Sequence, residues 1–245
     1  MTQGAAATPY TFHMPWSQRL MSIVGIVVLA GATVFMIVIA VLIAAQHWEL
    51  ALSVMAPCAA LMAALTGYVG RDLGAKLGLR VAFGGDAVTL DLPGGRSLIH
   101  RPTTQHVTIP YSDIAGIETR LEAYESLGMA IMQRAYVLIR KSGESIFLFE
   151  DRALGTALES SDFAKVAAEL AARAGVTIHD LGMVEGKGGV LAVWGTHAAD
   201  WSAPSLPLAQ QLRLWRHAAV TGTLALAVTI LAIVLRVTVF AVSGQ

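Results

Sequence analysis

Charged residues are scarce in this 245-residue chain, and cysteine is almost absent. Only 14% of the residues are Asp, Glu, Lys or Arg, whereas 55% are hydrophobic, a composition too apolar for an ordinary soluble domain. The single cysteine, Cys58, lies inside an apolar run, which excludes an intrachain disulfide framework and a cysteine-rich metal site. The composition therefore predicts a membrane protein.

Long uncharged runs account for the high hydrophobic content. Residues 20–45 and residues 50–69 each provide roughly the 20 apolar residues needed to cross a bilayer. Because only a short turn joins them, we expect an antiparallel helical hairpin. A third apolar run follows Arg216, and we predict a third span over residues 217–240. Arg236 lies near its far end, where it is either an interfacial anchor or a functional arginine within the membrane.

Positive charges near the span ends predict the orientation of the chain. Six Lys or Arg residues lie on one side of the predicted spans, and the turn between the first two spans has none. Since such residues are enriched on the cytoplasmic side, we expect a multi-pass protein of a bacterial inner membrane. Its N-terminus and central domain are predicted to be cytoplasmic and its C-terminus periplasmic. The predicted membrane-interface anchors are Trp16, Arg19, Trp48, Arg71, Arg216 and Arg236.

Changes in composition divide the chain into five predicted parts. They are a cytoplasmic N-terminal segment (1–19), the transmembrane hairpin (20–70), a cytoplasmic β-domain (81–175), a Gly-, Pro- and Trp-containing connector (176–215) and the third transmembrane helix (217–240). The connector contains Trp194 and Trp201. The stretch "AVWGTHAADWSAPSLPLAQQ", with two tryptophans, two prolines and little charge, is either a pliant linker that lies on the lipid headgroups or an ordered loop docked on the β-domain or on a partner protein. We expect Trp194 and Trp201 as the partner contacts.

Apolar and polar residues alternate within residues 81–175, which is typical of short antiparallel strands. "AVTLDL" and "SLIHR" flank a Pro-Gly-Gly turn, "RAYVLIR" and "ESIFLFE" flank Lys-Ser-Gly, and "HVTIPY" and "IAGIETR" predict two more strands. The insertion at residues 121–133 is long for a turn, and we expect a short helix there. The stretch "ESSDFAKVAAELAARAG" predicts one amphipathic helix, capped by Ser160 or Ser161 and ended by Gly175.

This order of strands closed by one helix, with "IPYSDIAGIETR" before the last hairpin, resembles the pleckstrin-homology-like (PH-like) domains of bacterial membrane proteins. The resemblance covers about residues 81–175. It implies an antiparallel β-domain closed by one α-helix, and together with the three apolar runs it predicts an α+β membrane protein with three transmembrane helices and this domain in the cytoplasm. It also implies a binding or scaffolding module that contacts proteins rather than performing chemistry.

Sequence motifs for chemistry are incomplete. In "GMVEGKGGVL" (residues 182–191), Gly182 and Gly186 enclose three residues where a phosphate-binding loop needs four, and Gly188 replaces the magnesium-binding hydroxyl residue. We therefore expect no nucleotide. The histidines, His100 and His106 among them, show no metal-binding spacing. We assign no catalytic, cofactor-binding or metal-ligating residue.

The acidic residues of the β-domain raise a further question. Glu118, Glu122 and Glu125 gather near Arg120, either as carboxylates for acid–base chemistry or, as we expect, as a solvated acidic face. Residues 81–212 contain ten Lys or Arg and fifteen Asp or Glu. This net charge of −5 is unfavourable for nucleic acid and for anionic lipid surfaces.

Three functions remain open at this point. The first is a non-enzymatic assembly factor or accessory subunit of an inner-membrane complex, with a protein partner and the lipid bilayer as its contacts. The second is a membrane-bound enzyme or transporter component with an unrecognised site. The third is a lipid- or stress-sensing membrane module.

Overall fold

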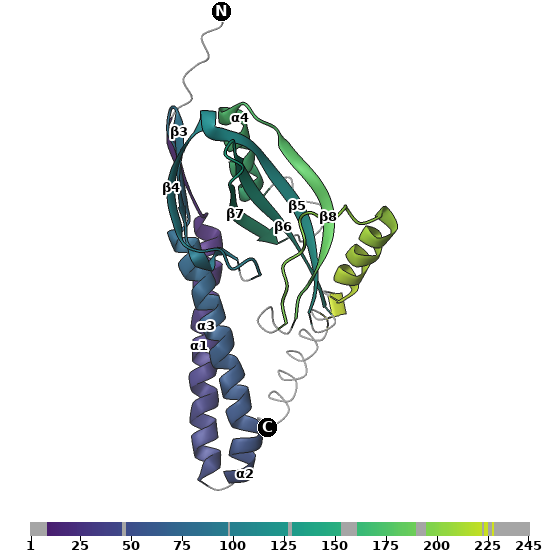
Figure 1. Ribbon diagram of the computed structural model, residues 1–245. Coiled ribbons are helices and arrows are strands. Elements are labelled where there is room, and N and C mark those ends of the chain that lie inside the picture. Colours follow the sequence, from purple (N-terminus) through teal and green to yellow (C-terminus); the bar gives the residue numbers. More distant parts are fainter. Residues whose placement is uncertain are drawn as a thin grey trace, which may run out of the picture. The chain divides into compact units, whose positions relative to one another are not determined.

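The structure is a computed structural model and describes residues 9–45, 48–97, 99–126, 129–152, 161–189, 195–221, 223–224 and 227. It is an α+β chain with two four-stranded sheets (Figure 1). The chain forms two compact units. Unit 1 comprises Met1–Ser97 and Arg101–Pro110, and unit 2 comprises Leu98–His100 and Tyr111–Gln245.

Two long helices of unit 1 form a hairpin in which α1 and α3 run side by side (Figure 1). The helical elements of this hairpin are α1 (Trp16–Ala44), α2 (Trp48–Leu50), the π-helical turn η1 (Ala51–Met55) and α3 (Ala56–Gly78). The segments Arg19–Ala44 and Ser53–Gly78 are long and apolar enough to cross a membrane. Thr33 and Thr66 meet between the two helices, with 3.1 Å between their hydroxyl oxygens. The predicted helical hairpin is therefore present.

Unit 1 also contains an antiparallel sheet, which we call sheet A. Its strands, in spatial order, are β1 (Tyr10–His13), β2 (Arg80–Phe83), β3 (Ala87–Leu92) and β4 (Gln105–Pro110). Alternate residues of β3 are buried, as its sequence pattern predicts. The edge strand β1 lies in the segment (1–19) that we predicted only as a cytoplasmic N-terminal segment, without a strand.

The predicted hairpin around the Pro-Gly-Gly turn is wrong. A 3₁₀ turn, η2 (Gly94–Arg96), follows β3, and β3 pairs with β4 instead of with residues 97–101. The Arg96 guanidinium explains the longer connection, because it donates hydrogen bonds to the carbonyls of Leu92, Pro93 and Thr103. These bonds hold the chain in a wide loop between β3 and β4, in place of a tight hairpin turn.

Unit 2 contains the second sheet, which we call sheet B. Its strands, in spatial order, are β7 (Ser145–Arg152), β6 (Met129–Arg140), β5 (Ile114–Ser126) and β8 (Ile178–Lys187), and the 3₁₀ turn η3 (Tyr111–Asp113) precedes β5. The predicted β6–β7 hairpin is confirmed, and Gly143 in its turn has a φ of +86°. The predicted short helix at residues 121–133 is wrong, because the described residues of that stretch extend β5 and β6.

The amphipathic helix α4 (Asp162–Ala174) is confirmed with its predicted ends. The Ser161 hydroxyl accepts a hydrogen bond from the Ala164 amide at 3.0 Å, and Gly175 is left-handed with a φ of +66°. The buried face of the helix includes Phe163, whose ring stacks on Phe149 of β7 with 4.4 Å between the ring centroids.

The helix is not the last element of the unit. The strand β8 follows α4 and pairs with β5 in parallel. It lies within the stretch that we predicted as a connector and includes Gly182 and Gly186 of the glycine-rich motif.

Candidate functional site

A carboxylate lies buried in the middle of sheet B. Glu122 of β5 is 0% exposed, and its neighbours at alternate positions, Arg120 and Tyr124, are buried as well. Successive side chains of a strand point to opposite faces, so these three residues share one face of the sheet. The predicted solvated acidic face is therefore wrong for Glu122.

Four side chains hold this carboxylate. The Oε2 atom of Glu122 lies 2.9 Å from His100 Nε2 and accepts hydrogen bonds from Tyr124 Oη at 2.9 Å and Gln133 Nε2 at 3.0 Å. The Oε1 atom accepts a bond from the indole N–H of Trp201 at 2.5 Å. Because a carboxylate only accepts hydrogen bonds, His100 must carry its proton on Nε2.

These contacts decide the protonation of the site. Burial raises the pKa of Glu122, but the hydrogen bond and charge of His100 and the bonds from Trp201 and Gln133 lower it further than burial raises it. The pKa of Glu122 is thus below its usual range, and the group is ionised at neutral pH. Burial and the Glu122 charge raise the pKa of Tyr124, so Tyr124 remains a protonated donor.

The same face of sheet B binds the segment of residues 195–207, which we call the strap. Arg120 donates hydrogen bonds to the backbone carbonyls of Trp201 and Ala203. The Tyr124 hydroxyl accepts the backbone N–H of Ala199 at 3.1 Å. Side chains of the sheet therefore bind main-chain groups of the strap.

Strand β8 holds the strap from its edge. The Leu206 amide donates to the Met183 carbonyl at 2.7 Å, and the Met183 amide donates to the Ser205 hydroxyl at 3.1 Å. Lys187 and His197 exchange two backbone hydrogen bonds of 3.1 and 2.9 Å. The strap is consequently an ordered, docked segment, which was one of the two alternatives for the predicted connector.

The glycines of the suspected nucleotide motif make room for this docking. A Cβ on Gly182, whose φ is +78°, would lie 2.2 Å from the Ser205 hydroxyl oxygen. A Cβ on Gly186 would lie 2.3 Å from the Tyr124 ring and 3.0 Å from the Ala199 nitrogen. The distances of 2.2 and 2.3 Å are shorter than side-chain packing allows, so these two positions need glycine for steric reasons.

A helix over residues 208–221 continues from the strap. Leu121, Ala123, Met132 and Met183 form an apolar cluster on sheet B, and Leu206, Leu214, Trp215 and Ala218 pack against it. Leu121 and Ala123 alternate with Glu122 along β5, so they lie on the opposite face. The chain therefore crosses the β8 edge of sheet B, with the strap on one face and the helix on the other.

The predicted interface anchors lie at different places. Trp16 and Trp48 are 67% and 64% exposed and begin α1 and α2, at opposite ends of the hairpin. Arg71 on α3 and Arg216 on the helix of residues 208–221 are exposed, and Arg19 in the first turn of α1 is half-buried. Of the two residues predicted to contact a partner, Trp201 donates its indole N–H to Glu122 within the chain. Arg236, Trp194 and most of the predicted span 217–240 lie outside the described residues.

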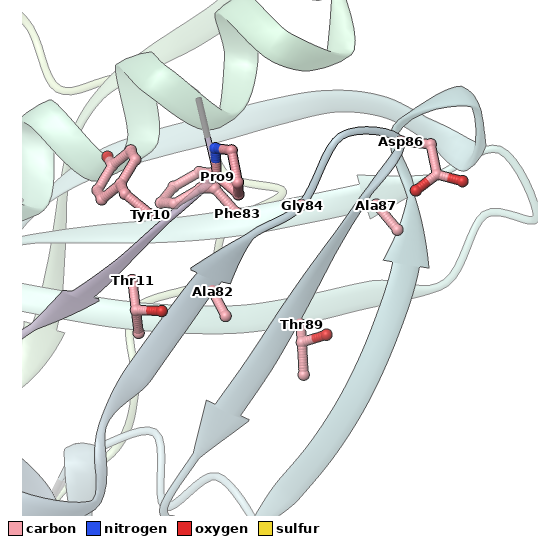
Figure 2. A pocket seen from close by; sticks show the side chains of 9 residues that line it. All are labelled: Pro9, Tyr10, Thr11, Ala82, Phe83, Gly84, Asp86, Ala87 and Thr89. Carbon is pink, nitrogen blue, oxygen red and sulfur yellow. The ribbon is translucent and has the colours of Figure 1, made fainter. Parts of the chain in front are cut away.

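Other chemistry finds little support in the described part of the chain. His100 and His106 lie beside different carboxylates, Glu122 for His100 and Asp91 for His106. Among the described residues, no group of three or more His, Cys, Asp or Glu could hold a metal ion. A shallow depression of about 390 Å³ lies on sheet A, where Thr11, Ala82 and Thr89 point the same way (Figure 2). Glu122 is not among the residues that line this depression.

A pattern in the sequence indicates the buried cluster, although none of the motifs for chemistry includes it. In "RLEAYE", the polar residues Arg120, Glu122 and Tyr124 alternate with the apolar residues Leu121 and Ala123. This period of two is typical of a strand with two different faces. The partners His100, Gln133 and Trp201 come from distant parts of the chain, and no local pattern indicates them.

Comparison with known proteins adds no further identification. No family model matches the chain, and neither a curated protein nor a solved structure shows significant similarity to it.

Proposed function

We propose that this chain is a non-enzymatic integral membrane protein that mediates protein contacts as an assembly factor or accessory subunit of a bacterial inner-membrane complex. In this proposal the α1–α3 hairpin anchors the protein in the bilayer, and a third span over residues 217–240 follows the strap and its helix. The β-rich part, a PH-like module by resemblance, lies in the cytoplasm.

The observation that carries the proposal is the exposure of apolar side chains on α1. Val27, Val28, Val41 and Leu42 are each 63–66% exposed, and none of the most apolar part of this helix is buried within the chain. A continuous apolar surface of this kind is unfavourable in water but matches the hydrocarbon of a bilayer.

Two features of unit 2 favour contact over catalysis. The buried carboxylate Glu122 has its oxygens occupied by donors from the chain itself, which leaves it poorly suited to transfer a proton to a substrate. Arg120 and Tyr124 bind the backbone of an extended segment, which is how peptide-binding domains hold their ligands.

Topology reporters test the membrane part of the proposal. A reporter that works only in the periplasm should be active when fused after Gln245 and inactive when fused at Glu150. The reverse pattern, or activity at both positions, would contradict the proposed orientation.

Purification in mild detergent with crosslinking tests the contact function. We expect a partner in constant ratio to this chain, recovered again when the tag is moved to the partner. A chain that purifies alone and converts a substrate would refute the proposal.

A further inference from the structure

We propose that the face of sheet B formed by Arg120, Glu122 and Tyr124, which we call the strap groove, recognises extended peptides with one tryptophan flanked by small residues. The strap is its intramolecular occupant, and it competes with such a peptide from another molecule. This inference rests on the proposed contact function and specifies the chemistry of the partner.

The groove recognises the main chain of its ligand. Apart from the single bridge at His197, the strap has neither helix nor strand, so its polar backbone groups need other partners. Arg120 binds the carbonyls of Trp201 and Ala203, and Tyr124 binds the amide of Ala199. Contacts to the backbone do not depend on the ligand's side chains, so any segment with the same extended course can make them.

One side chain of the strap, Trp201, makes the groove selective for the residue at its position. The Trp201 indole donates to the fully buried Glu122 carboxylate. Phenylalanine has no donor, and tyrosine carries its hydroxyl at a different place on the ring. A buried carboxylate without this donor would lose a charge-assisted hydrogen bond, so the groove favours tryptophan at this position.

The groove also selects by the size of the side chains on either side of the tryptophan. Ala199 is buried against Tyr124 and Val184, and Ala203 packs on the same cluster. Gly186 lets the Ala199 backbone lie close to β8, since a Cβ on Gly186 would be 3.0 Å from the Ala199 nitrogen. Ala199 is buried and Ala203 is half-buried, so the groove favours a small residue two positions before the tryptophan most strongly and, to a lesser degree, two positions after it.

The strap does not bind every hydrogen-bond donor of the groove. Arg120 is 2% exposed, and its Nε atom has no hydrogen-bond partner in the part of the chain that the structure describes. A buried donor without a partner destabilises the bound arrangement. A ligand that supplies one more acceptor would recover this free energy and could displace the strap.

A peptide-binding experiment tests the inference on the full chain in detergent. The probe is a fluorescent peptide with the sequence of residues 195–207, "GTHAADWSAPSLP". In the wild type the strap has the advantage of a high effective concentration, so the peptide should bind weakly. In Trp201→Ala the groove loses its intramolecular anchor, and we expect the peptide to bind about tenfold more tightly.

Two controls make the result specific. Trp16→Ala, which removes an exposed tryptophan of α1, should bind the peptide as weakly as the wild type. A peptide carrying Trp201→Phe should lose most of its affinity for the Trp201→Ala protein. Equal binding of the two peptides, or no binding to a Trp201→Ala protein that still unfolds cooperatively, would overturn the inference.

A second variant keeps the test valid if Trp201→Ala does not fold. Trp201→Phe keeps an aromatic ring and removes only the indole N–H, so it should bind the wild-type peptide a few-fold more tightly than the wild-type protein does. An affinity equal to that of the wild type would overturn the inference. Such a failure would leave membrane insertion and partner recovery unchanged, which separates it from a failure of the proposed function.

Discussion

The helical hairpin of unit 1 and sheet B of unit 2 place their side chains in opposite ways. Along α1 and α3 many large apolar side chains are exposed, whereas the small polar Ser22 is buried and accepts a hydrogen bond from Lys76 at 2.9 Å. In sheet B the charged groups Arg120 and Glu122 are buried instead. The hairpin therefore has an apolar surface long enough to cross a bilayer, while sheet B uses buried charge to hold one specific segment.

The largest expected effect comes from placing charge on the apolar surface of the hairpin. Val27→Arg combined with Val34→Arg puts two arginines on exposed positions of α1. Each arginine near the centre of a span costs about 2.5–3.5 kcal/mol of insertion free energy, so the double variant should largely lose membrane integration, measured by alkaline extraction. A water-facing surface would tolerate the change within about 0.5 kcal/mol. The matched control is Val27→Leu with Val34→Leu, and full integration of the arginine variant would contradict the comparison.

Removal of the buried charge in sheet B should have the next largest effect. Glu122→Ala removes an acceptor from the buried Tyr124 and Gln133 and from the half-buried His100 and Trp201. Each buried polar group that loses a partner costs about 1–3 kcal/mol, so the free energy of unfolding should fall by about 3–5 kcal/mol in a denaturant titration in detergent.

Glu125→Ala is the matched control for this change. It removes an exposed carboxylate from the same strand, and it should change the free energy of unfolding by no more than about 0.5 kcal/mol. Similar losses in the two variants would show that Glu122 has no special role.

A smaller effect is expected where the strap crosses β8. Gly186→Ala places a methyl group against the buried Tyr124 ring, and overpacking of this kind costs about 1–3 kcal/mol. Lys187→Ala, at the next and exposed position, should be nearly neutral. Thermal unfolding measures both variants. A greater loss of thermal stability for Lys187→Ala than for Gly186→Ala would contradict this steric account and would support a binding loop around Lys187.

The smallest expected effect is a dependence on pH. The pKa of Glu122 is lowered from 4.5 in the folded chain, so the unfolded chain binds this proton more readily. Its contribution to stability is therefore complete above about pH 4.5 and is lost as the pH falls through the lower folded pKa. Denaturant titrations at pH 7 and pH 3 should show a decrease for the wild type that is smaller for Glu122→Gln. Equal decreases would show that Glu122 is not the titrating group.

Several local patterns in the sequence predicted local structure correctly, although the hairpin at the Pro-Gly-Gly turn and the short helix at residues 121–133 were wrong. The helix α4 and its caps depend on residues within one segment, and the β6–β7 hairpin depends on its own turn. The hairpin of α1 and α3 follows from the length of the apolar runs. Each of these predictions needed only contacts between neighbours along the chain.

Distant contacts account for what the sequence could not predict. Strand β8 is extended because it pairs in parallel with β5, more than 50 residues earlier in the chain, and its glycines suggested a loop. The wide loop after β3 depends on the three carbonyls that Arg96 binds. The Glu122 cluster joins residues between His100 and Trp201, so no local pattern reveals its members.

Hydrogen exchange followed by mass spectrometry tests the central contrast most directly. The wild type and Glu122→Gln would be compared in lipid nanodiscs, and exchange would be measured in the strap and in the α1–α3 hairpin. We predict that the substitution speeds exchange in the strap, where Ala199 and Leu206 lose protected amides, and leaves α1 and α3 unchanged. Equal protection of the strap in the two proteins would contradict the account, because the buried carboxylate would then not hold it.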